Sequence, residues 1–174
     1  MGIGIIVCGL NGSGKSTFGK ALSEKLGLHF IDAETLFFPE ADARQIYTAP
    51  RSREEAERLL MQEVKAHESF VLASVKGNYG EWILTSYHYA VLINAPKDIR
   101  LQRVRNRSFQ KFGNRMLPGG DLYGQEKAFF DIVSSRTERY VEEWAQSLDC
   151  PIIRVDGTRP IEKNLAFVIE QIQG

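Results

Sequence analysis

The chemically informative residues of this 174-residue chain are concentrated near its start, where residues 9–17 read G-L-N-G-S-G-K-S-T. This stretch fits the pattern G-x-x-x-x-G-K-[ST], whose glycines allow positive φ and a close approach of the backbone to an anion. Lys15 would reach the β- and γ-phosphates of a nucleotide, and the Ser16 hydroxyl would ligate Mg²⁺. We therefore expect the following residues to bind the phosphates of ATP: Gly9, Leu10, Asn11, Gly12, Ser13, Gly14, Lys15, Ser16 and Thr17.

The residues on either side have the order that such a phosphate-binding loop requires. Residues 3–8 form an apolar run without alternation, which is typical of a buried parallel strand. After the loop, Phe18, Leu22 and Leu26 recur at helical spacing, and the helix is expected to end at Gly27. The loop therefore leads from a strand into a helix N-terminus, where the backbone favours an anion.

Length and composition set bounds on the rest of the chain. With 43% apolar and 25% charged residues, residues 1–174 are expected to form a single domain. Lys plus Arg and Asp plus Glu both number 22, so no net charge attracts nucleic acid or an anionic membrane. Neither a signal-peptide pattern nor an apolar run of about 18 residues occurs. We expect a cytoplasmic monomer or homodimer with no nucleic-acid or membrane partner.

The cysteines and histidines follow no metal-binding spacing. Cys8 and Cys150 are expected to be reduced, small apolar residues. The three histidines are scattered and no Cys-x-x-Cys pair occurs, so the sequence predicts no transition-metal site.

Strands and helices alternate along the chain, which favours a parallel sheet with helices on both faces. We predict a three-layer α/β/α fold with five parallel strands in the order 2-3-1-4-5, and ligands at the carboxyl ends of the strands. An acceptor-binding region is expected at about 33–68, and a mobile loop at 109–122 within a lid at about 108–123. The remaining strands are expected at 29–31, 70–73, 89–93 and 152–155, and the remaining helices at about 52–67, from Pro96 through Arg107, at about 123–148 and from about Pro160.

Two carboxylates directly follow the second predicted strand. Asp32 and Glu34 could hold the water molecules of Mg²⁺, and one of them could take a proton from an attacking hydroxyl. We expect Asp32 to act in catalysis and on the metal, and both residues to contact the acceptor. The alternative is that Asp32 only caps the next short helix, as Asp often does.

Arginines crowd the helix that follows the fourth strand. Arg103 and Arg107 are four residues apart and so share one helix face. Because phosphoryl transfer needs cations on the γ-phosphate, we expect both of them, with Arg115 of the lid, to stabilise the transferring group. The alternative is an ordinary solvated basic face. Arg136 and Arg139 of the next helix are secondary candidates.

Basic and aromatic residues near the second and third strands are candidates for binding the acceptor. Arg51 and Arg53 lie at the start of a predicted helix, and Lys76 and Tyr79 follow the third strand. Cations there would suit an acceptor with a carboxylate or a phosphate. Ser74 stands where a motor-type ATPase has an Asp that binds Mg²⁺, which disfavours that class.

Together these residues resemble the small P-loop kinases, and the shikimate kinase and gluconate kinase branch more than typical adenylate kinases. The loop at 9–17 is similar to that of this branch. Residues 27–34 are similar to its Gly-Leu-x-Phe-Ile-Asp-x-Asp segment, with Glu34 in place of the second Asp. Residues 73–79 resemble the gluconate kinase stretch after the third strand, but they are one residue shorter.

Three further stretches bear on this resemblance. The R-x-x-x-R pattern of Arg103 and Arg107 is shared with the nucleotide kinases. Residues 156–160 resemble the adenine-binding loop of these kinases, and residues 112–121 match none of the well-known lids, which indicates a separate subfamily. The resemblance implies that a group of residues contacts the nucleotide base: Gly157, Thr158 and Arg159.

The resemblance implies an enzyme that moves the γ-phosphoryl group of Mg·ATP to a small-molecule acceptor. One alternative is a nucleoside monophosphate kinase, in which basic residues around Arg51 would hold the phosphate of the acceptor. A more distant alternative is an ATP-binding regulatory module that phosphorylates no metabolite.

Overall fold

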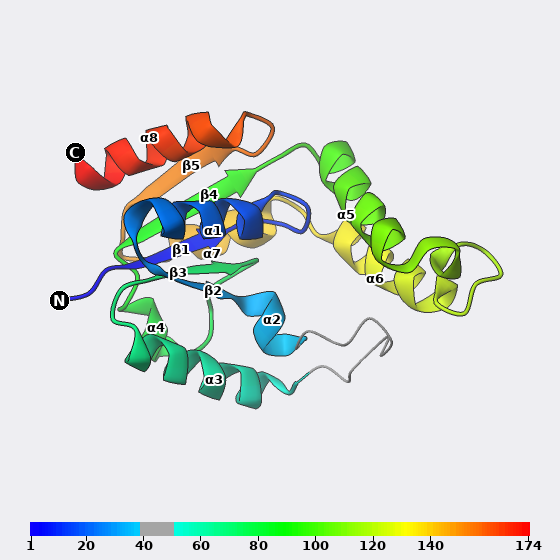
Figure 1. The fold of residues 1–174 in the computed structure, drawn as a ribbon, viewed down its shortest axis with the longest axis horizontal. Coiled ribbons are helices and arrows are strands. Elements are labelled where there is room, and N and C mark those ends of the chain that lie inside the picture. Colours follow the sequence, from blue (N-terminus) through cyan, green and yellow to red (C-terminus); the bar gives the residue numbers. More distant parts are fainter. Residues whose placement is uncertain (39–50) are drawn as a thin grey trace.

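The computed structural model describes residues 1–38 and 51–174. Its centre is a five-stranded, fully parallel sheet with the order β2-β3-β1-β4-β5 (Figure 1). This arrangement confirms the predicted fold class and strand order. The strands are β1 (Gly4–Cys8), β2 (His29–Asp32), β3 (Phe70–Ser74), β4 (Tyr89–Asn94) and β5 (Ile152–Asp156).

Helices cover both faces of the sheet, and two of them project beyond the carboxyl ends of the strands (Figure 1). The helices are α1 (Lys15–Leu26), α2 (Ala33–Phe37), α3 (Arg53–Ala66), α4 (Glu81–Leu84), α5 (Lys97–Phe112), α6 (Tyr123–Ser135), α7 (Arg139–Gln146) and α8 (Ile161–Gln173), with a 3₁₀ turn, η1 (Gly113–Met116), after α5. The projecting pair is α5 and α6. Within the described ranges, no helix is both long enough and apolar enough to span a bilayer.

Strand β1 contributes to both halves of the core, because successive residues of a strand point to opposite faces. Ile5 and Val7 pack with α1 and α8 on one face of the sheet. Ile6 and Cys8 pack with α3, α4 and α7 on the other face. Every residue of β1 is buried, as expected for the central strand of a parallel sheet. The loop that follows β1 therefore starts from a rigid base.

Two helix ends follow the local signals of the sequence. Helix α1 ends at Gly27, whose φ of 66° is the left-handed conformation that glycine adopts without strain. Helix α3 begins with a capping box, in which Ser52 and Glu55 each accept the backbone N–H of the other. The predicted acceptor-binding region lies on α2 and α3, and its residues 39–50 fall outside the described part of the chain.

The single helix predicted at 123–148 is wrong, because the chain forms two helices there, α6 and α7. Ser134 and Ser135, at the end of α6, donate their hydroxyls to backbone carbonyls three residues earlier, at 3.1 and 2.7 Å. Such bonds compete with the backbone donors that would continue a helix. Arg136 then leaves the helix with a ψ of 130°. The break allows α7 to pack on the sheet while α6 stays beside α5.

The loop predicted at 109–122 is also wrong in part. Helix α5 continues to Phe112, because no glycine or proline interrupts it before Gly113, where φ is 58°. The turn η1 follows, and the Arg115 carbonyl accepts the Leu122 N–H at 2.9 Å. The predicted lid is therefore a largely helical unit made of the end of α5, η1 and the start of α6.

Candidate active site

The predicted phosphate loop connects β1 to α1 at the carboxyl edge of the sheet. Gly14 precedes α1 with a φ of 96°, and no side chain of residues 1–38 or 51–174 caps the first N–H groups of the helix there. A Cβ atom placed on Gly14 would meet no atom of the described residues within 4 Å. The start of α1 therefore presents its N–H groups to open space, which is what an anion-binding helix terminus requires.

Two other glycines shape the loop by allowing close packing. A Cβ atom on Gly12 would lie 2.3 Å from the carbonyl oxygen of Arg100 in α5. One on Gly9 would lie 2.6 Å from the carbonyl oxygen of Ile93 in β4. Because any side chain at these positions would displace the loop, glycine here holds the loop against β4 and α5.

Charged side chains from three predicted segments influence the pKa of Lys15. Burial lowers the pKa of Lys15 to about 8, against the opposing influence of the Glu34 and Asp32 carboxylates. The guanidinium groups of Arg107 and Arg136 add to the lowering of this pKa. Two carboxylates and two guanidinium groups thus act electrostatically on one partly buried ammonium group, and a perturbed pKa of this kind is typical of a functional site.

Asp32 ends β2 and caps α2. Its Oδ1 atom accepts the Glu34 N–H at 3.0 Å, and its carbonyl accepts the Thr35 hydroxyl at 2.8 Å. The capping role is therefore present, and it coexists with a position close enough to influence the pKa of Lys15. The two roles are compatible, because a carboxylate has two oxygens and can accept several bonds.

Arg103 lies between two backbone segments of the site. Its guanidinium donates to the carbonyl of Gly12 at 3.1 Å and to the carbonyl of Gly157 at 3.0 Å. Arg107, one turn further along α5, is exposed and influences the pKa of Lys15. The two arginines that share a helix face therefore differ: Arg103 joins the phosphate loop to the loop after β5, and Arg107 presents its charge to the site.

The predicted base-binding residues follow β5 and lie beside the phosphate loop. A Cβ atom on Gly157 would be 2.6 Å from the Ser13 carbonyl oxygen, so this contact requires glycine. Thr158 donates its N–H and its hydroxyl to Asp156 Oδ1, at 2.8 and 2.6 Å, and these bonds lower the pKa of the Asp156 carboxyl. Arg159 is exposed. Contact of this loop with a nucleotide base stays a prediction.

Arg115 lies in η1, within the predicted lid. It forms a two-pronged ion pair with Asp121, with Nε–Oδ1 and Nη2–Oδ2 distances of 2.9 and 2.5 Å. The hydrogen bonds from Arg115 lower the pKa of the Asp121 carboxyl. The pair closes the turn between η1 and α6, and a role of Arg115 on the transferring phosphate stays a prediction.

Arg136 and Arg139, the secondary candidates for binding the transferring phosphate, lie in different surroundings. Arg136 donates to the side-chain oxygen of Asn11 in the phosphate loop at 3.0 Å and lies 5.3 Å from the centre of the Tyr140 ring. Arg139 pairs instead with Glu143, at 2.9 Å, on the exposed part of α7. No local pattern could distinguish them, because the position of Arg136 depends on the break between α6 and α7.

Two of the predicted acceptor residues lie together at the start of α3. Arg53 donates to the Asn78 carbonyl at 2.5 Å and lies 5.6 Å from the centre of the Tyr79 ring. Tyr79 is buried, and its hydroxyl lies 2.7 Å from Ser74 Oγ. Since Ser74 donates its single proton to the Lys76 carbonyl at 2.6 Å, the Tyr79 hydroxyl is the donor in that pair. Burial raises the pKa of Tyr79, so the hydroxyl stays protonated.

The other two predicted acceptor residues hold parts of the protein itself. The Lys76 ammonium lies 3.6 Å from the centre of the Tyr140 ring in α7. Arg51 donates to the carbonyls of Leu36 and Thr35 at 3.0 and 3.4 Å, near the end of α2. These contacts order the loops around the site, and acceptor binding by Lys76 and Arg51 stays a prediction.

The donors predicted for Mg²⁺ are oxygen atoms, as this hard cation requires. Ser16 lies in the first turn of α1, directly after Lys15. Asp32 ends β2 and lies near enough to Lys15 to influence its pKa. This donor set, beside the open space at Gly14, fits a Mg²⁺ ion that accompanies nucleotide phosphates.

Comparison with known families agrees with this geometry. Residues 5–114 match the AAA domain family AAA_18, and the chain belongs to this family. The chain is a small P-loop kinase by class, as its phosphate loop, its strand order and its similarity to kinases indicate.

Three curated relatives cover different shares of the chain. YqaC of Bacillus subtilis, described as an uncharacterized protein, is 27% identical over 176 residues, which span 97% of this chain and 96% of YqaC. A shikimate kinase of Gloeobacter violaceus is 30% identical over 130 residues, 70% of this chain and 71% of that enzyme. A cytidylate kinase of Aeropyrum pernix is 32% identical over 111 residues, 59% of this chain and 63% of that enzyme.

Solved structures share the fold over almost the whole length. A shikimate kinase from Bacteroides thetaiotaomicron has a TM-score of 0.62 at 18% identity and covers 99% of both chains. A gluconokinase from Sinorhizobium meliloti has a TM-score of 0.53 at 18% identity, with 98% of this chain and 95% of that chain covered. At this identity the likeness establishes the fold, and the acceptor has to be argued from the site.

Proposed function

We propose that this protein transfers the γ-phosphoryl group of ATP to a hydroxyl group of a small-molecule acceptor. The strongest support is that Lys15 lies at a helix start which no described side chain caps, and that two carboxylates and the exposed guanidinium of Arg107 influence its pKa. Such a cradle suits a polyphosphate chain. A terminal phosphate bound there would face Asp32 and Arg107.

In the proposed reaction, the acceptor oxygen bonds to the γ-phosphorus while the bond from this phosphorus to the β–γ bridging oxygen breaks. ADP leaves with the electron pair of that bond, and Asp32 takes the proton of the acceptor hydroxyl. Lys15 and Arg107 offset the negative charge of the transferring group. Mg²⁺, held through Ser16 and Asp32, supplies further charge neutralisation when bound. Catalysis of this kind depends on positioning and electrostatics.

For the acceptor we propose a hydroxy acid. Arg53, over the Tyr79 ring, and Lys76, over the Tyr140 ring, would place cations on the acceptor side. A guanidinium group is suited to a carboxylate because its N–H groups match two oxygens at once. The relatives include a shikimate kinase and a gluconokinase, and shikimate and gluconate are both hydroxy acids.

The second candidate function is a nucleoside monophosphate kinase. The observation in its favour is the 32% identity to a cytidylate kinase, although this match covers only 59% of the chain. In this reading Arg51 and Arg53 would hold the phosphate of the acceptor nucleotide. Both assignments use the same ATP site and differ only in what binds near α3.

The test is ADP release from Mg·ATP with a panel of acceptors: shikimate, gluconate, other sugar acids, nucleosides and nucleoside monophosphates. We expect acceleration by a hydroxy acid. Acceleration by AMP, CMP, UMP or GMP would establish the nucleotide kinase instead. Binding of ATP without acceleration by any compound would contradict both and leave the regulatory module.

Asp32→Asn separates the catalytic role of Asp32 from its capping role. Asn caps a helix about as well as Asp, so the free energy of unfolding should change little. Loss of the base should lower turnover by about 10²–10⁴-fold while ATP still binds. Glu34→Gln is the matched control on the same turn, with a smaller expected effect on turnover. Unchanged turnover in Asp32→Asn would leave Asp32 with a capping role alone.

A further inference from the structure

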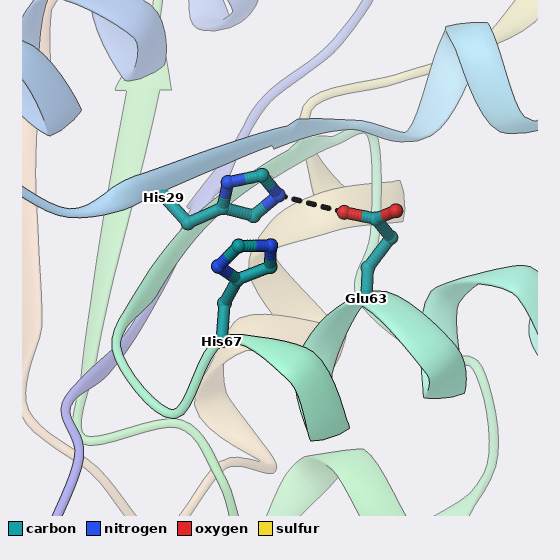
Figure 2. Close-up of side chains that lie close together, drawn as sticks. All are labelled: His29, Glu63 and His67. Carbon is teal, nitrogen blue, oxygen red and sulfur yellow. Dashed lines mark hydrogen bonds and ion pairs between the residues drawn. The ribbon is translucent and has the colours of Figure 1, made fainter.

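Two of the three histidines lie together, although they are far apart in the sequence. His29 begins the edge strand β2, and His67 directly follows α3. Glu63, in the last turn of α3, lies to one side of the two rings, with its carboxylate toward His29 (Figure 2). All strands are parallel, so β2 starts at the amino ends of the strands, whereas the phosphate loop lies at their carboxyl ends. The group is therefore separate from the candidate active site.

The three side chains face one another (Figure 2). His29 Nε2 lies 2.7 Å from Glu63 Oε2. The rings of His29 and His67 are stacked, with 3.6 Å between their centres and 11° between their planes. One ligand atom from each of the three residues can be chosen so that all lie within 4.8 Å of one another. His29 and Glu63 are half-buried, and His67 is exposed.

A histidine–carboxylate pair accounts for only part of this arrangement. It explains the contact between His29 and Glu63, but not a second imidazole ring held parallel to the first. Within the described part of the chain, the ring of His67 stacks on His29 and makes no hydrogen bond. Two imidazole rings beside a carboxylate together offer the donor atoms that a shared metal ion requires.

The donor chemistry selects the kind of cation. Imidazole nitrogens suit zinc, copper and nickel, whereas Mg²⁺ prefers oxygen atoms. In a tetrahedral zinc site with Zn–N distances of about 2.0–2.1 Å, ligand atoms lie about 3.3 Å apart. The ligand atoms of the three residues lie within 4.8 Å of one another, and the exposed side chain of His67 has room to adjust toward an ion.

The backbone already fixes the positions from which these side chains extend. The His67 N–H donates to the Glu63 carbonyl at 3.0 Å, which holds the two residues one helical turn apart. The His29 N–H donates to the Ser69 carbonyl at 3.1 Å, only two residues after His67. Both bonds hold the start of β2 against the turn between α3 and β3, so the backbone of the site is fixed and only side chains would have to adjust to a metal ion.

We propose that His29, Glu63 and His67 bind a late first-row divalent metal ion, with Zn²⁺ as the physiological candidate, in a site that ties the edge strand β2 to the end of α3. The two imidazoles and the carboxylate supply three ligands, and water completes the coordination. The ion stabilises the fold and takes no part in phosphoryl transfer. The proposal does not depend on the proposed function.

The test uses the full chain, stripped of metal with a chelator and then titrated with Zn²⁺ in a calorimeter. We expect saturable binding of one ion per chain and a rise in melting temperature that grows with Zn²⁺ concentration. An excess of Mg²⁺ should neither compete nor produce the same rise. Replacement of Zn²⁺ by Co²⁺ should give the visible absorption of a cobalt–imidazole complex.

Two variants make the assignment specific. His67→Ala removes one exposed ligand outside the core and should weaken Zn²⁺ binding by at least about tenfold, since changes even behind a ligand have effects of this size. His88→Asn removes the third histidine, which lies outside the group, and should leave Zn²⁺ binding unchanged. ATP binding should be the same in His67→Ala as in the original protein. Equal Zn²⁺ affinity in His67→Ala, or no one-to-one binding at all, would overturn the proposal.

Discussion

The partly buried ammonium of Lys15 predicts that this residue reduces the stability of the fold. Burial disfavours the charged form and lowers the pKa of Lys15 from 10.5 to about 8. At pH 7 the amine is charged in both the folded and the unfolded state, so the folded state bears the full cost of burying the charge. Lys15→Met keeps most of the apolar stem and removes this cost. The variant should therefore be more stable at pH 7 and unable to hold ATP phosphates.

The size of the effect follows from the pKa. The difference between a pKa of 10.5 and one of about 8, at about 1.4 kcal/mol per pKa unit, sets an upper limit of about 3–4 kcal/mol. Because the ammonium is still partly exposed to water, we expect a gain of about 1–3 kcal/mol. Between pH 8 and 10.5 the unfolded state binds more protons than the folded state, so the original protein gains stability as pH rises. The advantage of Lys15→Met should shrink over the same range.

The measurement is urea unfolding of both proteins at several pH values from 7 to 10. Taking the difference between the two proteins removes the contribution of the other groups that titrate in this range. Lys20→Met, an exposed position on the same helix, is the control and should change the free energy of unfolding little at any pH. A Lys15→Met variant that is less stable than the original protein at pH 7, or a difference that does not vary with pH, would refute the reasoning.

Further predictions concern ATP affinity and the packing of the phosphate loop. ATP affinity should fall by up to about tenfold per pH unit above pH 8, because binding requires the charged form of Lys15, and a flat profile in isothermal titration would contradict this. Arg103→Lys should weaken ATP binding by about tenfold and destabilise the fold by about 1–2 kcal/mol, because one ammonium cannot reproduce both guanidinium bonds to backbone carbonyls. Equal ATP affinity in the variant and the original protein would show that these bonds do not position the phosphate loop. Gly12→Ala should cost more than about 2 kcal/mol in urea unfolding, because its Cβ would lie 2.3 Å from a backbone oxygen. Gly14→Ala meets no atom and should cost only about 1–2 kcal/mol, from its positive φ, while it obstructs the anion site; equal unfolding costs for the two glycine variants would contradict the packing argument.

The elements that form the phosphate site could be predicted because their signals are local. An apolar run, a glycine loop and a helix that ends at Gly27 follow one another within the first 27 residues, and the capping box of α3 spans only four. The break between α6 and α7 could not be predicted in this way. It depends on Ser134 and Ser135 turning their hydroxyls onto the backbone, which serines within a helix also do without ending it.

The roles of single side chains depended on contacts distant in the sequence. Arg136 meets Asn11 across 125 positions, and nothing near either residue indicates the pair. The grouping of His29 with His67 arises in the same way, from an edge strand placed beside the end of a helix. On sequence alone the histidines count as scattered, because residue spacing predicts which side chains are neighbours only within one helix or strand.

The arginines of α5 differ in burial, and their burial indicates which of them hold the phosphate loop and which can contact a phosphate. Arg100 is 3% exposed, donates to the Ala95 carbonyl at 3.0 Å, and its own carbonyl lies against Gly12. Arg103, half-buried, uses its guanidinium to bond backbone carbonyls of two loops. Arg107 is exposed, and its charge acts on Lys15. A guanidinium that already satisfies backbone carbonyls positions the phosphate loop, whereas one that remains in solvent near Lys15 can move onto an incoming phosphate. We therefore expect Arg107 to be the arginine that contacts the transferring phosphoryl group. Arg100 and Arg103 are expected to hold the loop that binds the nucleotide.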